Sequence, residues 1–122
     1  MKRRVVIPTE DAEGTTVAEH FGRSPYYITI DLNEDGSLSN RTIHPNTGGH
    51  MGGTGHAHDN VMNLLPNVVI VQGMGPRGIT GFQSHGVAVL KANSQSVEQV
   101  LSAYVSGSLS ELTEGCADAH HR

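Results

Sequence analysis

The stretch from Val68 to Lys91 places the tightest constraint on how this chain can fold. Its first residues, Val68–Val71, form a run of β-branched side chains that is typical of a strand buried on both faces. Pro76 follows a glycine-rich turn and is well placed to open a helix, and Gly86 offers a helix stop before a second apolar run, Val87–Leu90. The stretch therefore predicts two parallel strands joined by a helix in a right-handed crossover.

The turn inside this unit, Gly73-x-Gly75-x-x-Gly78, has the spacing of a dinucleotide-binding fingerprint. That fingerprint expects an acidic residue about 20 positions further on. This chain has Lys91 and Ser94 in that region, and too little sequence follows for a second nucleotide-binding half. The motif still indicates a preference for an anion, because open amides at a helix N-terminus favour negative charge.

Composition narrows the possible functions. A chain of 122 residues supplies one domain, and its formal net charge of −4 argues against non-specific binding to nucleic acid or to an anionic membrane. No apolar run is long enough to span a bilayer, and we expect no signal peptide after Lys2. The single cysteine, Cys116, excludes an internal disulfide framework and fits a cytoplasmic protein.

The rest of the chain is predicted to form strands and helices around the strand–helix–strand unit of Val68–Lys91. Strands are expected at Arg4–Pro8, Tyr26–Asp31 and Leu38–His44, the last two as an antiparallel hairpin. Two further helices are expected. One spans Ala57–Leu65, with Val61, Leu64 and Leu65 at helical spacing. The other is capped by Ser94 or Ser96, buries Val97, Val100, Leu101 and Tyr104, and ends at Gly107.

The pattern predicts one α/β domain over residues 1–112, followed by a loose tail over residues 113–122. Its mixed sheet should have Arg4–Pro8 and Val68–Val71 near the centre and the hairpin at one edge.

Histidine is the unusual residue type, with eight histidines against eight lysines and arginines. The histidines with chemical promise fall in three groups. They are His20, before the second strand; His44, His50, His56 and His58, in or beside a glycine-rich loop; and His120 and His121, close to Cys116. Imidazole and thiolate are ligands for zinc, copper and iron–sulfur iron. Each group also has a purely structural interpretation, as a hydrogen-bonded loop residue, a polar low-complexity loop or a solvated chain end. His85 is explained by the C-terminal end of the central helix alone.

Catalysis is less well supported than binding. A two-metal nuclease would need carboxylates on the central strands, and Asp31 ends a strand without a second acid. Cys116 lies in the predicted tail, where no rigid scaffold would hold a thiolate in attack geometry.

Taken in order, four segments resemble the dinitrogenase iron–molybdenum cofactor biosynthesis family, which includes NifX-like proteins and the C-terminal part of NifB. They are RRVVIPTE, HFGRSPYYITID, the glycine- and histidine-rich loop, and VVIVQGMGPRGITGFQSHGV. The resemblance implies a ribonuclease-H-like α/β domain with a mixed sheet of about five strands. It also implies a non-catalytic carrier of an iron–molybdenum or iron–sulfur cluster, with cluster donor and acceptor proteins as partners. It places His20, Phe21, Gly22 and the turn Gly73–Gly78 at the ligand site.

We therefore expect a cluster at the carboxyl edge of the parallel strands, where ligands of open α/β sheets usually bind. The turn containing Met74 would supply amides, Arg77 a countercharge and His20 a nitrogen ligand. The remaining candidate ligands are His50, His56 and His58, and, in the tail, Cys116 and His120. The segments His44–Gly55 and Cys116–Arg122 should be mobile without ligand. One cysteine cannot form a four-thiolate site within one subunit. The cluster must therefore use histidines, use a second subunit, or arrive preassembled.

Two alternatives stay open on the residues alone. The first is a histidine-rich module for a divalent transition metal such as zinc, nickel or copper. The second is a regulatory domain that binds an anion or nucleotide through the amides of Gly75–Gly78 and through Arg77.

Overall fold

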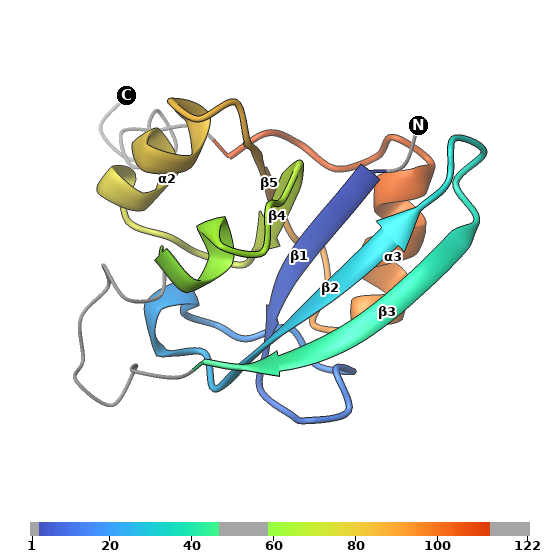
Figure 1. Cartoon of the computed structure of the whole chain (residues 1–122), viewed down its shortest axis with the longest axis horizontal. Coiled ribbons are helices and arrows are strands. Elements are labelled where there is room, and N and C mark those ends of the chain that lie inside the picture. The colour runs from blue at the N-terminus through green and yellow to red at the C-terminus, as the bar shows by residue number, and fades with distance from the viewer. Residues whose placement is uncertain (1–2, 47–58, 113–122) are drawn as a thin grey trace.

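A computed structural model describes residues 3–46 and 59–112 of the chain (Figure 1). In chain order the elements are β1 (Arg3–Thr9), the 3-10 turn η1 (Phe21–Arg23), β2 (Tyr26–Leu32), β3 (Leu38–Pro45), β4 (Val68–Val71), α2 (Pro76–Gln83), β5 (Ala88–Lys91) and α3 (Val97–Val105). Residues 59–62, between β3 and β4, are also α-helical. This order of strands and helices is the one that the sequence predicts.

The five strands form one mixed sheet in the order β3-β2-β1-β4-β5. Strands β1, β4 and β5 are parallel neighbours, whereas β2 is antiparallel to β1 and β3 is antiparallel to β2. The prediction of a mixed sheet with β1 at its centre, β4 inside it and the hairpin at one side is therefore confirmed. Within the hairpin, only β3 is an edge strand.

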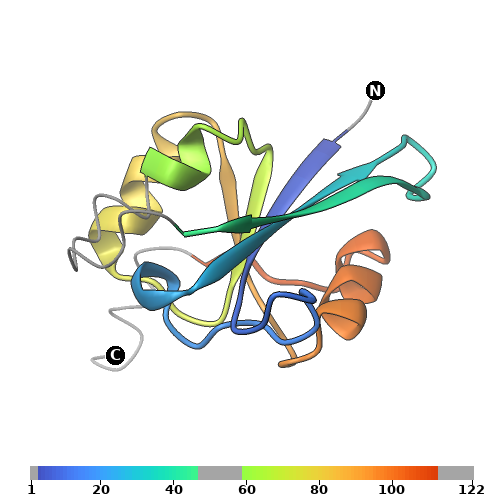
Figure 2. The same ribbon diagram turned by 60° about the horizontal axis from the view of Figure 1, so that its bottom comes forward.

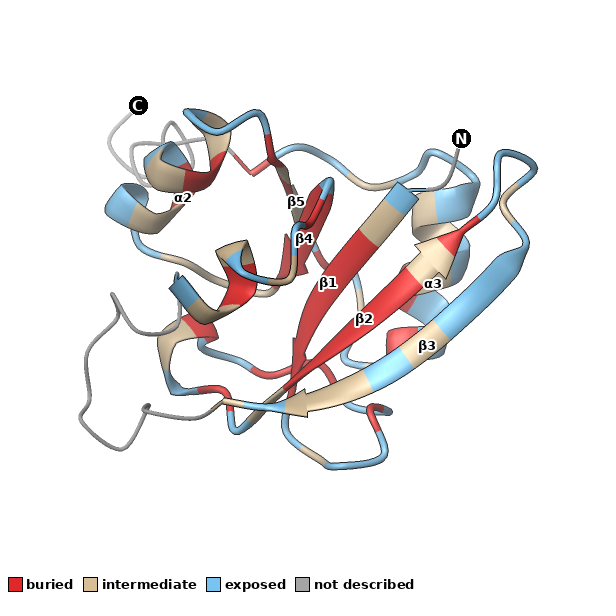
Figure 3. Cartoon of the chain, in the orientation of Figure 1, coloured by how far each residue is buried: buried red, intermediate tan, exposed pale blue. Residues whose placement is uncertain are grey.

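The sheet separates two apolar layers (Figure 2). On one face, α2 and the helical residues 59–62 pack against the strands; this layer includes Val6, Val69, Val71, Val89, Val61, Ile79 and Phe82. On the other face α3 packs against Val5, Ile7, Val68, Ile70 and Ile30 through Val97 and Val100. Strand β4 is buried on both faces along its whole length, which explains its unbroken run of apolar residues (Figure 3).

The helix ends follow their expected chemistry. Ser96 is the residue before α3, and its side chain accepts a hydrogen bond of 3.3 Å from the backbone N–H of Gln99. Gly86 and Gly107 follow α2 and α3 with φ angles of 78° and 77°, a region that glycine adopts at little cost. His85 Nδ1 lies 2.9 Å from the carbonyl oxygen of Gly81, in the last turn of α2, as its helix-end interpretation predicts.

One prediction about the apolar pattern is wrong. The predicted helix Ala57–Leu65 places Leu65 at helical spacing with Val61 and Leu64, but its side chain is 75% exposed and its φ angle is 57°. The helical residues end at position 62, and Arg4 Nη1 donates a hydrogen bond of 2.8 Å to the carbonyl oxygen of Leu64. This contact with β1 holds the chain in a turn that points Leu65 outward, whereas Leu64 packs against the core as predicted.

The hairpin also extends further than predicted. Strand β3 ends at Pro45, one residue beyond the predicted Leu38–His44, and His44 pairs with Tyr27 across the ladder. Its Nε2 atom lies 3.1 Å from the hydroxyl oxygen of Thr29. The histidine therefore has a structural partner inside the sheet.

The free edge of β5 is covered by the end of the described chain. Lys91 donates its backbone N–H to the carbonyl oxygen of Ser110 over 2.9 Å, and Leu112 donates to that of Val89 over 2.8 Å. Leu112 is 4% exposed and Leu109 is partly buried, so both leucines pack against the core. None of the helices formed by residues 3–46 and 59–112 has the length and apolar character needed to cross a membrane.

The loop after β1 is held by Asp11, and its stability should depend on pH. Partial burial disfavours the charged carboxylate, but hydrogen bonds from the hydroxyl and N–H of Thr15 and the N–H of Thr16 outweigh this and lower the pKa of Asp11. Because the pKa of Asp11 is lower in the folded than in the unfolded state, its carboxylate stabilises the fold at pH values above the unfolded-state pKa. This stabilisation is lost as the pH falls through the folded-state pKa. We expect Asp11→Asn to lower the free energy of unfolding by less than ~1 kcal/mol at neutral pH, because the carboxylate is solvent-screened. In urea titrations this difference should shrink towards zero below about pH 4. A difference that grows in acid would contradict the assignment.

Candidate functional site

The carboxyl ends of the parallel strands are bordered by the segment that follows β1. This segment returns along β1, where Ala18 donates its N–H to the carbonyl oxygen of Pro8 over 2.8 Å. On its other side Val17 donates to the carbonyl oxygen of Gln95 over 2.8 Å, and Thr16 forms an isolated bridge with Ser96. The segment is thus fixed between β1 and the start of α3, and it leads directly to His20.

The glycine turn after β4 lies against this segment, as the sequence predicts. Gln72, the first residue after β4, donates a hydrogen bond of 3.0 Å from Nε2 to the carbonyl oxygen of Val17. A Cβ atom added to Gly73 would be 3.6 Å from the carbonyl oxygen of Glu19, the residue before His20. The two loops therefore meet at the carboxyl edge of β1 and β4.

The contact made by Gln72 can be tested by itself. Gln72→Met keeps the length of the side chain but removes the donor, so it should lower the free energy of unfolding by about 0.5–1.5 kcal/mol. Gln95→Met is the matched control, because that side chain is exposed and makes no side-chain hydrogen bond within residues 3–46 and 59–112. Equal unfolding midpoints for the two variants in urea would show that the Gln72 bond contributes nothing.

The glycine turn presents open backbone amides. The N–H groups of Gly73, Met74, Gly75 and Arg77 make no hydrogen bond with any other described residue. Gly75 stands at the N-terminus of α2 with open space around the position of a Cβ atom. Because unpaired amides and the helix dipole both place positive charge at this end of a helix, the turn favours an anion.

Gly78 has a structural role within this turn. Its N–H donates to the carbonyl oxygen of Gly75 over 3.1 Å, so this amide is already used within the turn. A Cβ atom on Gly78 would lie 2.9 Å from both Cγ and Sδ of Met74, whose side chain packs against the core. The absence of a side chain at Gly78 therefore leaves room for Met74.

His20 lies in the loop that meets this turn and is open to solvent. It is the residue before η1, its side chain is 69% exposed, and Nε2 lies 3.9 Å from Oε1 of Glu19. Phe21 follows and is only 5% exposed; its ring packs edge-on against Phe82, with centroids 5.6 Å apart, and at a tilt against Tyr27, at 5.7 Å. Phe21 thus anchors the turn in the core and leaves His20 free on the surface.

The aromatic cluster also includes a buried hydroxyl. The Tyr27 hydroxyl donates to the carbonyl oxygen of Phe21 over 3.4 Å, and burial raises the pKa of Tyr27 well above its ordinary value. The hydroxyl therefore remains a neutral donor that supports the Phe21 carbonyl. Gly22, in the middle of η1, is half-buried.

The charges around the two loops are mixed. Arg77 is exposed and has no ion-pair partner in the part of the chain that the structure describes. Glu19 carries an exposed carboxylate beside His20, and its own N–H is held by Oε2 of Glu10 over 3.3 Å. The glycine turn and Arg77 favour an anion, whereas Glu19 opposes one. Neither Glu19 nor Gln72 was singled out from the sequence, although a polar residue directly after a buried strand is a usable signal.

Among residues 3–46 and 59–112, no three histidine, cysteine, aspartate or glutamate side chains come together as a metal site. The other candidate ligands lie outside the described residues: His50, His56 and His58, and in the tail Cys116 and His120. Within the described chain, the candidate site is therefore an amide-lined turn beside the loop that holds one exposed histidine.

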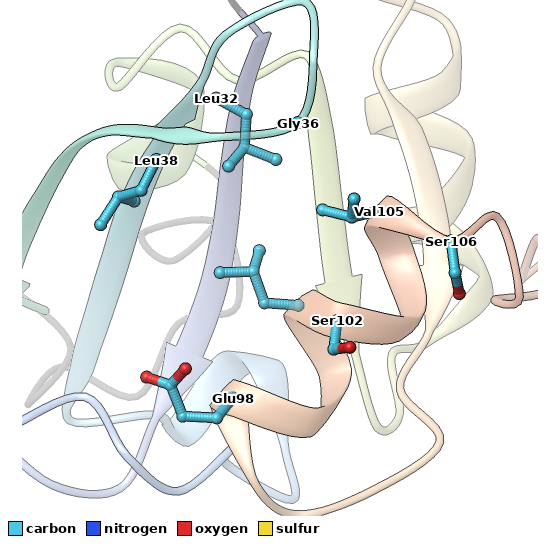
Figure 4. A pocket seen from close by; sticks show the side chains of 8 residues that line it. Leu32, Gly36, Leu38, Glu98, Ser102, Val105 and Ser106 are labelled. Carbon is cyan, nitrogen blue, oxygen red and sulfur yellow. The ribbon is translucent and has the colours of Figure 1, made fainter.

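A shallow depression of about 430 Å³ lies elsewhere, between α3 and the far end of the β2–β3 hairpin (Figure 4). Its walls are mainly apolar, including Leu32, Leu38 and Val105, and its carboxylate, Glu98, is paired with Arg41 at 2.9 Å. Leu32 pairs with the first residue of β1, so the depression is at the opposite end of the strand from His20. It offers no cluster of donors, and we do not assign the function to it.

Comparison with known proteins agrees with the resemblance. A solved structure, PH0822, superposes with a TM-score of 0.76 and 28% identity, covering 89% of this chain and 96% of that one. A NifB-like protein from Thermotoga, TM1290, superposes with a TM-score of 0.72 and 25% identity, covering 91% and 94%. The uncharacterised protein MJ0580 of Methanocaldococcus jannaschii is 29% identical over 112 residues, which are 89% of this chain and 91% of that protein.

The fold and the glycine turn define a small open-sheet α/β protein with an anion-favouring edge. The sequence profile described as dinitrogenase iron-molybdenum cofactor matches residues 1–107. The chain belongs to this family, whose description links it to the iron–molybdenum cofactor of dinitrogenase.

Proposed function

We propose that this protein binds an iron–sulfur or iron–molybdenum cluster as cargo and carries it between a donor and an acceptor protein. The observation that supports this most directly is that the loop holding His20 meets the turn that carries the open amides. The contact of 3.6 Å between Gly73 and the carbonyl oxygen of Glu19 brings the two loops together.

The chemistry of the two loops suits such a cargo. Hydrogen bonds to the sulfurs are one of the means by which proteins tune iron–sulfur clusters, and no other described residue occupies the amides of Gly73, Met74 and Gly75. Arg77 adds positive charge, and His20 offers an imidazole nitrogen to a metal. Glu19 works against a negatively charged cargo and so limits its affinity. A site with few covalent ligands and opposed charges can release what it binds, as a carrier must.

The remaining candidate ligands are included in the proposal because of their residue types. His50, His56 and His58 would add imidazoles, and Cys116 with His120 would add a thiolate and another imidazole. We propose that residues 113–122 form a tail that takes part in this way, outside a domain of residues 1–112. We place the protein in the cytoplasm, as a carrier without catalytic activity.

Anaerobic reconstitution tests the proposal. The protein is incubated with ferrous iron and sulfide, with or without tetrathiomolybdate, and is then desalted and analysed for metal and sulfide. We expect a coloured protein that retains more than one iron and more than one sulfide per chain. Parallel samples with zinc or nickel test the divalent-metal alternative, which the Glu19–His20 pair would serve. Binding of zinc or nickel together with no retained sulfide would overturn the cluster proposal.

A further inference from the structure

Two asparagines hold the end of the turn that begins after His20. Asn46 follows β3; its Nδ2 donates to the carbonyl oxygen of Ser24 over 2.7 Å, and its backbone N–H donates to that of Pro25 over 2.9 Å. Asn60, in the helical residues 59–62, donates from Nδ2 to Oδ1 of Asn46 over 2.8 Å. Both asparagines are half-buried. A chain of side-chain amides therefore links this helix to the end of η1.

The chain of side-chain amides reaches η1 through Ser24. This serine closes η1, with its N–H 3.4 Å from the carbonyl oxygen of Phe21, and its hydroxyl donates to the carbonyl oxygens of Thr9 and Tyr26. The Ser24 carbonyl can only accept, so the Asn46 amide must point its nitrogen there and its oxygen towards Asn60. His20 stands at the opposite end of the same short turn.

The turn depends on outside support because its own bonds are long. The N–H of Arg23 lies 3.3 Å from the carbonyl oxygen of His20, beyond the usual range of about 2.7–3.2 Å. A three-residue 3-10 turn has little stability of its own. The His20 side chain makes no hydrogen bond within residues 3–46 and 59–112, so its position is set by the backbone of η1.

We propose that Asn46 and Asn60 are positioning residues that hold η1 so that His20 faces the glycine turn. The identity of the ligand of His20 rests on the proposed function, whereas the claim that the two asparagines fix the turn does not. In the sequence, residues 47–58 lie between these two asparagines.

The binding test is a double-mutant cycle. The probe is the cluster assembled from ferrous iron and sulfide, and its affinity is measured for Asn46→Ala and Asn60→Ala in the wild-type and His20→Ala backgrounds. We expect each change to weaken binding about fivefold in the wild type and less than about twofold when His20 is absent, because residues that act through one another are not additive. The control is Asn40→Ala, an exposed asparagine on β3 that should have no effect in either background. Equal weakening in both backgrounds would mean that the pair is merely structural, and it would overturn the proposal.

A second measurement needs no cluster. Amide hydrogen exchange of Arg23 and Ser24 in the unloaded protein should become about tenfold faster in Asn46→Ala than in Asn40→Ala, since local opening of the turn is easier. If the wild type binds no cluster, the proposed function fails and this exchange result alone decides the positioning claim. Unchanged exchange at both amides would contradict that claim.

Discussion

Replacing Phe82 with alanine should lower the free energy of unfolding by about 3–5 kcal/mol, the range observed for deletion of a fully buried phenylalanine ring. Phe82 is 0% exposed and lies at the centre of the layer between α2 and the sheet. The ring of Phe21 also packs against the ring of Phe82, with the two ring centroids 5.6 Å apart. The change therefore removes core volume and the anchor of the His20 turn together.

Urea unfolding of three variants tests this expectation. Phe82→Leu should cost less than Phe82→Ala because it leaves a smaller cavity. Leu65→Ala is the control for side-chain truncation without burial, and because Leu65 is 75% exposed it should change stability by less than about 0.5 kcal/mol. A loss below about 1 kcal/mol for Phe82→Ala would show that the ring is not packed as described.

Replacing His20 with alanine should weaken cluster binding at least tenfold, which corresponds to ~1.4 kcal/mol, while the unfolding midpoint stays unchanged. The imidazole is 69% exposed and makes no side-chain capping bond to η1, so its removal should affect binding alone. The measurement is competition for the reconstituted iron–sulfide cluster between wild type and variant, with thermal unfolding of the unloaded proteins alongside.

His85→Ala is the matched control for this prediction. His85 is also exposed, but it lies beyond the other end of α2, where its ring contacts the carbonyl oxygen of Gly81. It should bind the cluster like the wild type. If His20→Ala stays within about twofold of the wild type, His20 is not a ligand.

The fold could be predicted well where one local signal decides the structure. Val68–Val71 is β-branched throughout, and only a strand covered on both faces places all four residues in the core. Pro76 and Ser96 mark helix starts by their own backbone and side-chain chemistry. Leu65 could not be predicted, because its turn depends on a hydrogen bond from Arg4, about sixty positions earlier in the chain.

The candidate site was predicted in outline and not in the roles of its residues. The meeting of the His20 loop and the glycine turn follows from parallel strands ending at one edge. The sequence could not show that Phe21 faces the core or that Gly78 makes room for Met74, because both depend on packing between distant elements. The link through Asn46 was missed for the same reason.

The most direct test of the central claim is to map the cluster on the protein by NMR, by comparing amide signals before and after anaerobic loading with iron and sulfide. Our account predicts that signals of Gly73, Gly75, Arg77 and His20 shift or broaden, whereas those of Val105 and Leu38 beside the α3 depression stay unchanged. Perturbation centred on the depression, with the glycine turn and His20 unaffected, would contradict the account.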